Sequence, residues 1–341
     1  KLKINPYVVK RQDKNDNVLD TRLYGQVLWK LSDDLFIYHE ALLLGRHGSI
    51  QSLYPREYKK AGYNPLEFFL EYDYNSYLEF KFGSLKQDFL SAPLLITDKT
   101  FPAFRETISF SLPKEVTGQL LFQQAIPHNI DDGTEYFAQI TNTPFFLTGS
   151  LFLEKKSLPK LFNSGIEDKL TFFYFTPLTP AVARVGQREG NSTSGEGSDA
   201  GFSFQFVGIH NNIHWQIPIK DSWVIELGWD YLHNFGAPDS YNKGGRFYTS
   251  VYYDFFGLME LKATGEMFGN QSDSSIAFYN SWKYGHNNRQ GIGLELQGHF
   301  YQSGLTVGAR YMQTRPIETG RTSLDEGHYF SIYIETGYLS I

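Results

Sequence analysis

The chain of 341 residues has no cysteine and no long apolar run. Without cysteine it can hold no disulfide, no thiolate-bound metal and no cysteine nucleophile. No window approaches the roughly 18 consecutive apolar residues that a transmembrane helix needs. With 31 basic and 37 acidic residues, the chain also lacks the basic surplus typical of nucleic-acid binding, so we expect no nucleic-acid partner. One way of crossing a membrane stays open, because a barrel strand needs only about 9–11 residues with alternate positions apolar.

What the chain does contain is repeated alternation of apolar and polar residues. In the stretch 67–82, EFFLEYDYNSYLEFKF, seven of sixteen residues are aromatic and five are charged. The same period of two continues along much of the chain, in 222–231, 259–267, 290–300, 305–311 and 329–338. Such alternation over about ten residues predicts a β-strand with two different faces. We therefore predict an all-β fold of about 16 strands (between about 14 and 18), the first near 19–31 and the last near 327–339.

Clusters of turn-forming residues separate these runs. They lie at 75–76, 131–133, 236–245, 269–275, 285–288, 302–304 and 318–327, and the longest polar stretch, 186–201, is predicted to be a surface loop. A closed antiparallel barrel has short turns at one end and long loops at the other. The assignments break that rule, because the loop at 236–245 and the tight turn at 302–304 fall at the same end. One assignment between them must be wrong.

Two features favour a barrel with lipid outside and water inside. Aromatic side chains stand near strand ends on the apolar face, as in the girdles of membrane barrels; they are Trp29, Tyr72, Tyr74, Tyr77, Phe80, Phe82, Trp223, Tyr231, Tyr253 and Trp282. Carboxylates occupy mid-strand positions on the opposite face, as at Glu71, Glu226 and Glu295. Closure would also be required, since lipid cannot satisfy an unpaired strand edge. The alternative is a soluble, aromatic-rich β-propeller, sandwich or carbohydrate-binding domain.

On its repeated hairpins, on strands such as YLEFKFG (77–83) and on the final HYFSIYIETGYLSI, the sequence resembles the outer-membrane porins of Gram-negative bacteria. The resemblance implies a closed antiparallel transmembrane β-barrel over residues 19–341, with residues 1–18 as a periplasmic arm or partial strand. It also implies a bacterial outer membrane with lipopolysaccharide as the surroundings, and a homotrimer as the assembly. One departure is the last residue, Ile341, where such barrels usually end in an aromatic. Counting back by twos passes through Gly337, which predicts a bulge there or an atypical assembly signal.

The first ten residues, KLKINPYVVK, lack the basic stretch, apolar core and cleavage site of a signal peptide. We expect either that there was none or that this is the mature, processed chain.

The polar face of the strands would line the pore. The pore-lining candidates are Glu71, Asp73, Lys81, Glu226, Asp230, Arg246, Glu260, Lys262, Glu295, Arg310 and Glu335. Across all strands assigned in this way, acids outnumber bases, and acidic rings raise the local cation concentration. We therefore expect passive diffusion of small polar solutes or ions, with a mild preference for cations. The segment 88–106 is the candidate for a loop that folds inward, and Asp98, Lys99, Arg105 and Glu106 are its constriction candidates.

Other functions stay open. The cluster Ser203, His210, Asn212 and His214 superficially resembles the catalytic set of outer-membrane phospholipases, but the spacing and order differ. The two histidines alone do not make a metal site, so we expect no metal, no cofactor and no enzymatic activity. A barrel for polysaccharide export or a surface receptor is the remaining alternative, because the many tyrosines could stack on sugar rings.

Overall fold

The computed structural model describes residues 2–11, 14–49, 61–97, 99–127, 143–158, 164–196, 199–220, 222–318 and 326–337. Nearly all of its regular structure is β-strand. The strands are β1 (Leu2–Arg11), β2 (Lys14–Lys30), β3 (Leu35–Ser49), β4 (Ala61–Asn75), β5 (Leu78–Lys86), β6 (Thr100–Leu112), β7 (Val116–Ala125), β8 (Phe146–Leu158), β9 (Ser164–Phe175), β10 (Thr193–Ser194), β11 (Gly201–Phe202), β12 (Phe206–Lys220), β13 (Trp223–Asn234), β14 (Lys243–Phe255), β15 (Met259–Asn270), β16 (Arg289–Phe300), β17 (Leu305–Pro316) and β18 (Gly327–Glu335). The helical elements are η2 (Asp88–Leu90), α1 (Pro180–Arg188) and η4 (Trp282–Tyr284). Among the described residues, no helix is long and apolar enough to cross a membrane.

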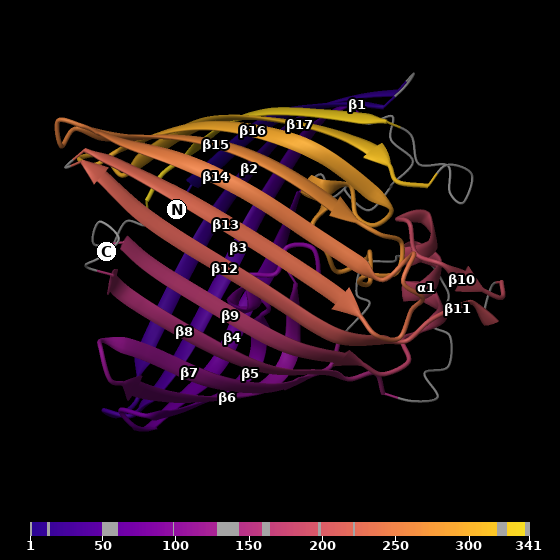
Figure 1. Cartoon of the computed structure of the whole chain (residues 1–341), viewed down its shortest axis with the longest axis horizontal. Helices are drawn as coiled ribbons and strands as arrows, with labels where there is room; N and C mark the ends of the chain where they lie inside the picture. Colours follow the sequence, from indigo (N-terminus) through magenta and orange to yellow (C-terminus); the bar gives the residue numbers. More distant parts are fainter. Residues whose placement is uncertain are drawn as a thin grey trace.

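Sixteen of these strands form one closed antiparallel barrel (Figure 1). Neighbours in sequence pair with each other, β9 pairs with β12 across the excursion that contains α1, and β1 closes the barrel against β18. The short strands β10 and β11 pair only with each other, outside the barrel wall. The prediction of an all-β antiparallel fold is confirmed. Residues 2–11, expected as an arm or partial strand, form a full strand of the wall.

The connections separate cleanly between the two ends of the barrel. At one end, which we call the short-turn end, β4 meets β5 at 76–77, β6 meets β7 at 113–115 and β16 meets β17 at 301–304. At the other, the long-loop end, lie the loops 87–99, 176–205 and 271–288, together with 235–242. The sequence assignment missed the turn at 256–258, between β14 and β15. With that turn in place, 235–242 and 301–304 fall at opposite ends, as a barrel requires.

Alternation along each strand separates an exposed apolar face from an interior polar face. In β16, Leu294 and Leu296 are each 64% exposed on the outer face. Glu295 between them points inward and accepts a hydrogen bond from Arg310 on β17. The hairpin of β4 and β5 repeats the pattern, with Phe68, Tyr72 and Phe82 exposed outside and Phe69 buried inside. Because the period is two, each strand can serve two different environments at once.

Candidate functional site: the barrel interior

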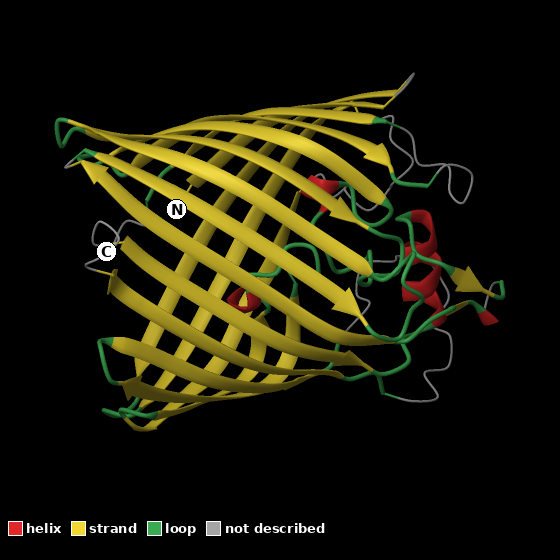
Figure 2. Cartoon of the chain, in the orientation of Figure 1, coloured by secondary structure: helices red, strands yellow, loops and turns green. Residues whose placement is uncertain are grey.

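Two loops from different parts of the wall fold into the barrel and join there (Figure 2). They are residues 87–97 and 271–287, which we call the loop bridge. The Thr97 amide donates to the Tyr279 carbonyl (3.0 Å), and the Ser281 amide donates to the Pro93 carbonyl (3.0 Å). Ser275 Oγ donates to the Leu94 carbonyl (2.7 Å). The segment 88–106, expected to fold inward, overlaps the first loop, but nothing in the sequence pattern identified the second loop as its partner.

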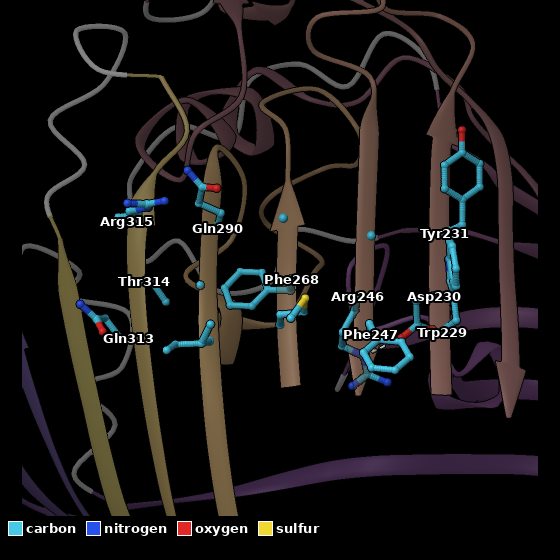
Figure 3. A pocket seen from close by; sticks show the side chains of 15 residues that line it. Trp229, Asp230, Tyr231, Arg246, Phe247, Phe268, Gln290, Gln313, Thr314 and Arg315 are labelled. Atoms are coloured by element: carbon cyan, nitrogen blue, oxygen red, sulfur yellow. Dashed lines mark hydrogen bonds and ion pairs between the residues drawn. The ribbon is translucent and has the colours of Figure 1, made fainter. Parts of the chain in front are cut away.

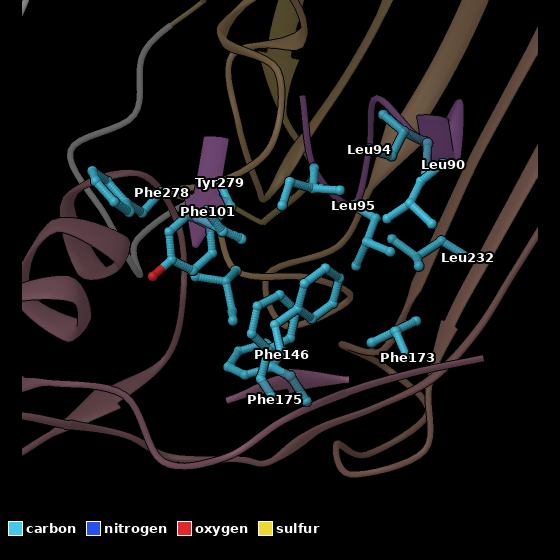
Figure 4. Close-up of a cluster of buried hydrophobic side chains, with 14 of the residues drawn as sticks. Leu90, Leu94, Leu95, Phe101, Phe146, Phe173, Phe175, Leu232, Phe278 and Tyr279 are labelled. Carbon is cyan, nitrogen blue, oxygen red and sulfur yellow. The ribbon is translucent and has the colours of Figure 1, made fainter. Parts of the chain in front are cut away.

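The loop bridge is held by apolar burial at the long-loop end. Leu90, Leu94, Leu95 and Ile96 of the first loop are buried to within 1% of full coverage. They pack with side chains of the wall and of the second loop in one cluster (Figure 4); among its members are Phe101, Phe146, Phe173, Phe175, Leu232, Ile276, Phe278 and Tyr279. Fully burying a Leu or Phe side chain contributes about 1.5–3 kcal/mol. A segment with so many buried apolar side chains is therefore fixed in place against the wall.

Asparagine and serine side chains satisfy the backbone of the second loop. Asn287 Nδ2 donates to the carbonyls of Ser272 (2.8 Å) and Ser275 (2.6 Å). Its Oδ1 accepts from Asn270 (2.7 Å) and from Asn280 (2.5 Å). A loop inside a barrel cannot leave buried carbonyls unpaired without a free-energy cost, so these amides act as the ladder that a strand would supply.

The segment between β9 and β12, which contains α1, forms hydrogen bonds with the second loop of the bridge. Asn191 Nδ2 donates to the carbonyls of Ser272 and Ser275, and its Oδ1 accepts from the Ala277 amide. The Asp273 carboxylate accepts from both the amide (2.9 Å) and the hydroxyl (2.6 Å) of Ser192. Burial raises the pKa of Asp273, although these hydrogen bonds oppose the rise. Residues 186–201, expected as a plain surface loop, thus include a buried anchor.

On one wall the loop bridge is surrounded by paired charges. Arg246 of β14 lies 2.5 Å from Asp230 of β13 and donates to the Tyr284 hydroxyl (2.7 Å). Tyr284 in turn donates to Glu266 (2.9 Å), which also pairs with Lys283. Burial lowers the pKa of Lys283, although Glu266 favours its charged form. Acids and bases here neutralise each other in a site that is mostly covered.

The wall across the barrel holds the first loop through Arg105 of β6. Its guanidinium stacks 3.6 Å from the centroid of the Phe89 ring and donates to Gln123 Oε1 (2.9 and 3.0 Å). Lys169 of β9 donates to the Phe89 carbonyl. Gln123 also donates to Gln87 (2.7 Å), at the start of the loop. The two loops therefore extend from opposite walls and meet between them.

The short-turn end of the interior carries charge differently. Three pairs of acids stand directly opposite each other on neighbouring strands: Asp73 with Glu79, Glu154 with Glu167, and Asp254 with Glu260. Like charges in directly opposite positions destabilise a sheet. Lys81 partly offsets the first pair, 3.4 Å from Glu79 and 3.1 Å from Glu71. In the other two pairs, His214 lies 3.8 Å from Glu167, and the Asp254 carboxylate accepts from the Gly257 amide (3.0 Å).

The predicted pore-lining residues all lie in barrel strands, on the face opposite the exposed apolar side chains. The constriction candidates are more scattered. Lys99 lies 4.4 Å from the Phe278 ring, at the junction of the two loops, and Arg105 supports the first loop from the wall. Asp98 lies outside the described residues. Glu106 is not in a loop: β6 begins at Thr100, and its register pairs Glu106 with the outward-facing Phe80 and Phe122.

The two histidines share the interior face of β12, as their spacing predicts, but they meet different partners. His210 Nε2 is 3.4 Å from Asp230, and His214 Nε2 is 3.1 Å from Glu226. Glu226 also accepts from Tyr252. Each histidine thus lies beside a carboxylate of β13, and sequence reasoning missed these contacts because β13 follows β12 only after a turn.

A tyrosine lies flat on the wall at two positions where the neighbouring strand has a glycine. A Cβ built on Gly228 would come within 1.9 Å of the Tyr248 ring, and one on Gly308 within 2.4 Å of the Tyr333 ring. These glycines let a large side chain lie along the wall instead of projecting across the interior. The hydroxyl of Tyr333 donates to Glu295 (2.7 Å), which fixes its direction.

Comparison with known proteins bears on the fold. No family model and no curated protein sequence matches the chain. Among solved structures, the chain is similar to OprB of Pseudomonas putida in its high-pH structure, with a TM-score of 0.61, 14% identity and coverage of 98% of this chain and 93% of that one. It is also similar to a loop-deletion mutant of OmpT of Vibrio cholerae (TM-score 0.52, 9% identity, 98% and 97% covered). For OmpF of Salmonella typhi, solved with daunomycin, the TM-score is 0.51 at 8% identity, with 97% and 95% covered. The resemblance to Gram-negative outer-membrane porins is confirmed at the level of architecture.

Proposed function

We propose that the protein is a channel of the bacterial outer membrane through which small polar solutes diffuse passively. The observation that carries the proposal is the division of each strand into an apolar outer face and a charged inner face. Leu294 and Leu296 stand exposed outside while Glu295 pairs with Arg310 inside. Closed barrels with this division are stable only with lipid around them and water within. The short-turn end then faces the periplasm, and the long-loop end faces the exterior.

In this proposal the loop bridge forms the constriction. It joins two walls of the barrel through Arg105 on one side and Arg246 on the other. A solute would have to pass beside it. Large or rigid solutes are therefore excluded, and the passage is narrower than the barrel itself.

We further propose a mild preference for cations, set at the periplasmic mouth. The three opposed acid pairs, above all Asp254 with Glu260, concentrate negative charge where the interior is open. Near the loop bridge, by contrast, acids are matched by bases. A focused negative potential at a mouth raises the local concentration of cations.

The first test is single-channel recording in a planar bilayer across a KCl gradient, with purified, refolded protein. We expect stable conductance steps and a reversal potential that indicates potassium over chloride. Folding is checked independently by heat-shifted migration on a gel. Folded protein that stays electrically silent would rule out the open channel, and a preference for chloride would rule out the role of the acid pairs.

We propose no enzymatic activity. The hydrolase alternative would need a hydroxyl within hydrogen-bond reach of His210 or His214. Among the described residues, the polar contacts of these two rings are with carboxylates and not with a hydroxyl. The expected result is no release of fatty acid from phospholipid micelles by protein that conducts ions. Release that is lost in His210→Gln would contradict this.

We also propose, in line with the architecture, that copies associate through the outer wall near β6. Glu106 faces outward between Phe80 and Phe122, where lipid is an unfavourable neighbour for a carboxylate. Chemical cross-linking in detergent is expected to give one discrete oligomer, weakened by Glu106→Arg. A protein that stays monomeric at all concentrations would contradict the assembly.

A further inference from the structure

The outer wall of the barrel is hollowed between β13 and β17, near the long-loop end (Figure 3). The hollow has a volume of about 740 Å³, and most of its lining residues belong to the outward-facing rows of five neighbouring strands. Sites for small molecules commonly fall between about 300 and 1,000 Å³. This hollow on the outer wall is therefore large enough to hold part of a bound molecule.

Two glycines form its floor, and packing does not require either of them. Gly245 and Gly269 face each other across β14 and β15. A Cβ built on Gly245 would lie 3.6 Å from the Asp230 carbonyl oxygen, and one on Gly269 would lie 4.0 Å from Cβ of Gln290; both are ordinary contact distances. Neither glycine has a positive φ. Since a side chain would fit at both positions, the hollow exists because side chains are missing where the barrel would tolerate them.

The hollow has an apolar side and a polar side. One row across the strands runs through Trp229, Phe247, Met267 and Ile292, all of them exposed. The next row toward the long-loop end starts at Tyr231, crosses the two glycines and ends in Gln290 and Arg315. Arg315 is exposed on the outer face. Guanidinium groups bind phosphate in a fixed, bidentate geometry.

We propose that this hollow binds one acyl chain of a lipid whose head group is an anionic phosphate. The chain would lie over Gly245 and Gly269 against the apolar row, and the phosphate would reach Arg315. The inference rests on the proposed function, because it places this face in the bilayer. The order of the rows favours a lipid over a second copy of the protein: the cationic and amide groups lie only on the side toward the membrane surface.

Native mass spectrometry of the protein in detergent micelles, titrated with phosphatidylglycerol or with the zwitterionic phosphatidylcholine, tests the site. The wild type is expected to keep phosphatidylglycerol at lower lipid concentration than phosphatidylcholine. Gly269→Leu fills the floor and should weaken phosphatidylglycerol binding roughly tenfold, the effect of losing contact with about two methylene groups. Arg315→Gln should remove the preference between the two lipids, whereas Arg315→Lys should keep it.

The matched control is Gly265→Leu. Gly265 lies on the same outward row of β15, a Cβ there would have 3.9 Å of room, and it does not line the hollow. The Gly265→Leu variant should bind phosphatidylglycerol as the wild type does. Equal phosphatidylglycerol binding by wild type and Gly269→Leu, or equal retention of both lipids by the wild type, would overturn the proposal. So would an oligomer that Gly269→Leu dissociates, because the hollow would then be a protein interface. Conductance is recorded on the same samples. Protein that conducts ions but does not bind the lipid would contradict the lipid site alone, whereas protein that does not conduct would contradict the channel proposal.

Discussion

At the long-loop end of the interior, Arg246 lies 2.5 Å from a fully buried Asp230, and Lys283 pairs with Glu266. At the short-turn end, Asp254 faces Glu260 directly, with no base on either of those strands at that position. The first arrangement suits a covered site, where an unpaired charge carries a high cost. The second is tolerable only in contact with water and counterions. Charge pairing along the wall therefore marks where the barrel is filled and where it is open.

The strongest test of this difference removes one base at each end. Arg246→Met leaves Asp230 buried without its cation and should lower the free energy of unfolding by about 3 kcal/mol. Lys81→Met removes a base beside Glu71 and Glu79, which are partly exposed, and should cost about 1 kcal/mol or less. Urea unfolding in lipid vesicles, followed by tryptophan fluorescence, measures both. Equal losses would mean that the two ends are equally wet.

The second prediction concerns the loop bridge. Replacing Leu94 and Leu95 by Asp places two charges in a fully buried cluster and should release the first loop from the wall. Single-channel conductance should then rise about twofold or more, since it follows the width of the narrowest part. The control is Leu28→Asp, on the interior face but 62% exposed near the short-turn end. Unchanged conductance in the double variant would exclude the loop bridge as the constriction.

The third prediction changes selectivity. Asp254→Asn with Glu260→Gln removes one opposed pair and should lower the ratio of potassium to chloride permeability about twofold. The same change should raise stability by about 0.2–1 kcal/mol, because the like charges no longer repel each other. Glu106→Gln, on the outer face, removes a charge without touching the interior and should leave the reversal potential unchanged. If both variants shift it alike, the charge of the whole protein sets selectivity.

The smallest expected effect is a dependence on pH at Asp273, which is held by hydroxyl and amide donors instead of a base. Its pKa in the folded state is raised, so the fold binds this proton more tightly than the unfolded chain does. The protonated Asp273 side chain therefore contributes its full stabilisation below the ordinary aspartate pKa of about 3.9, and this stabilisation is lost as the pH rises through the pKa of the folded state. Asp273→Asn should therefore become more stable relative to wild type as the pH rises above the ordinary aspartate pKa.

Much of the wall could be predicted from the sequence, because alternation is a local property. The hairpin of β4 and β5 has the faces that its sixteen residues predict, with Glu71, Asp73 and Lys81 inside. The turn at 256–258 was missed for a physical reason. It is built from Phe256 and Gly257, both with positive φ, and an apolar turn between aromatic residues reads as a continuing strand.

The filling of the barrel could not be predicted in the same way. The pattern places Trp282 near a strand end on the apolar face, whereas it lies in η4 within the second loop of the bridge. Aromatic residues that pack inside a barrel have the same composition as those that face lipid. Contacts such as Ser275 with the Leu94 carbonyl join positions 181 residues apart, and nothing local encodes them. Glu106 shows how strongly the assignment of faces depends on where a strand begins. If the predicted start of the strand is wrong by a few residues, a carboxylate on the outer face is assigned to the interior.

The pairing of β1 with β18 sets the order in which such a chain can assemble. Every other neighbouring pair except β9 with β12 joins strands that are consecutive in the sequence, so those hairpins can form as the chain emerges. Closure waits for the last strand, and contacts between distant segments are slow to form. Until β18 arrives, both edges of the sheet offer unpaired backbone groups to any neighbouring chain. A chain with this topology therefore keeps two edges open to pairing with other chains until its last strand is in place.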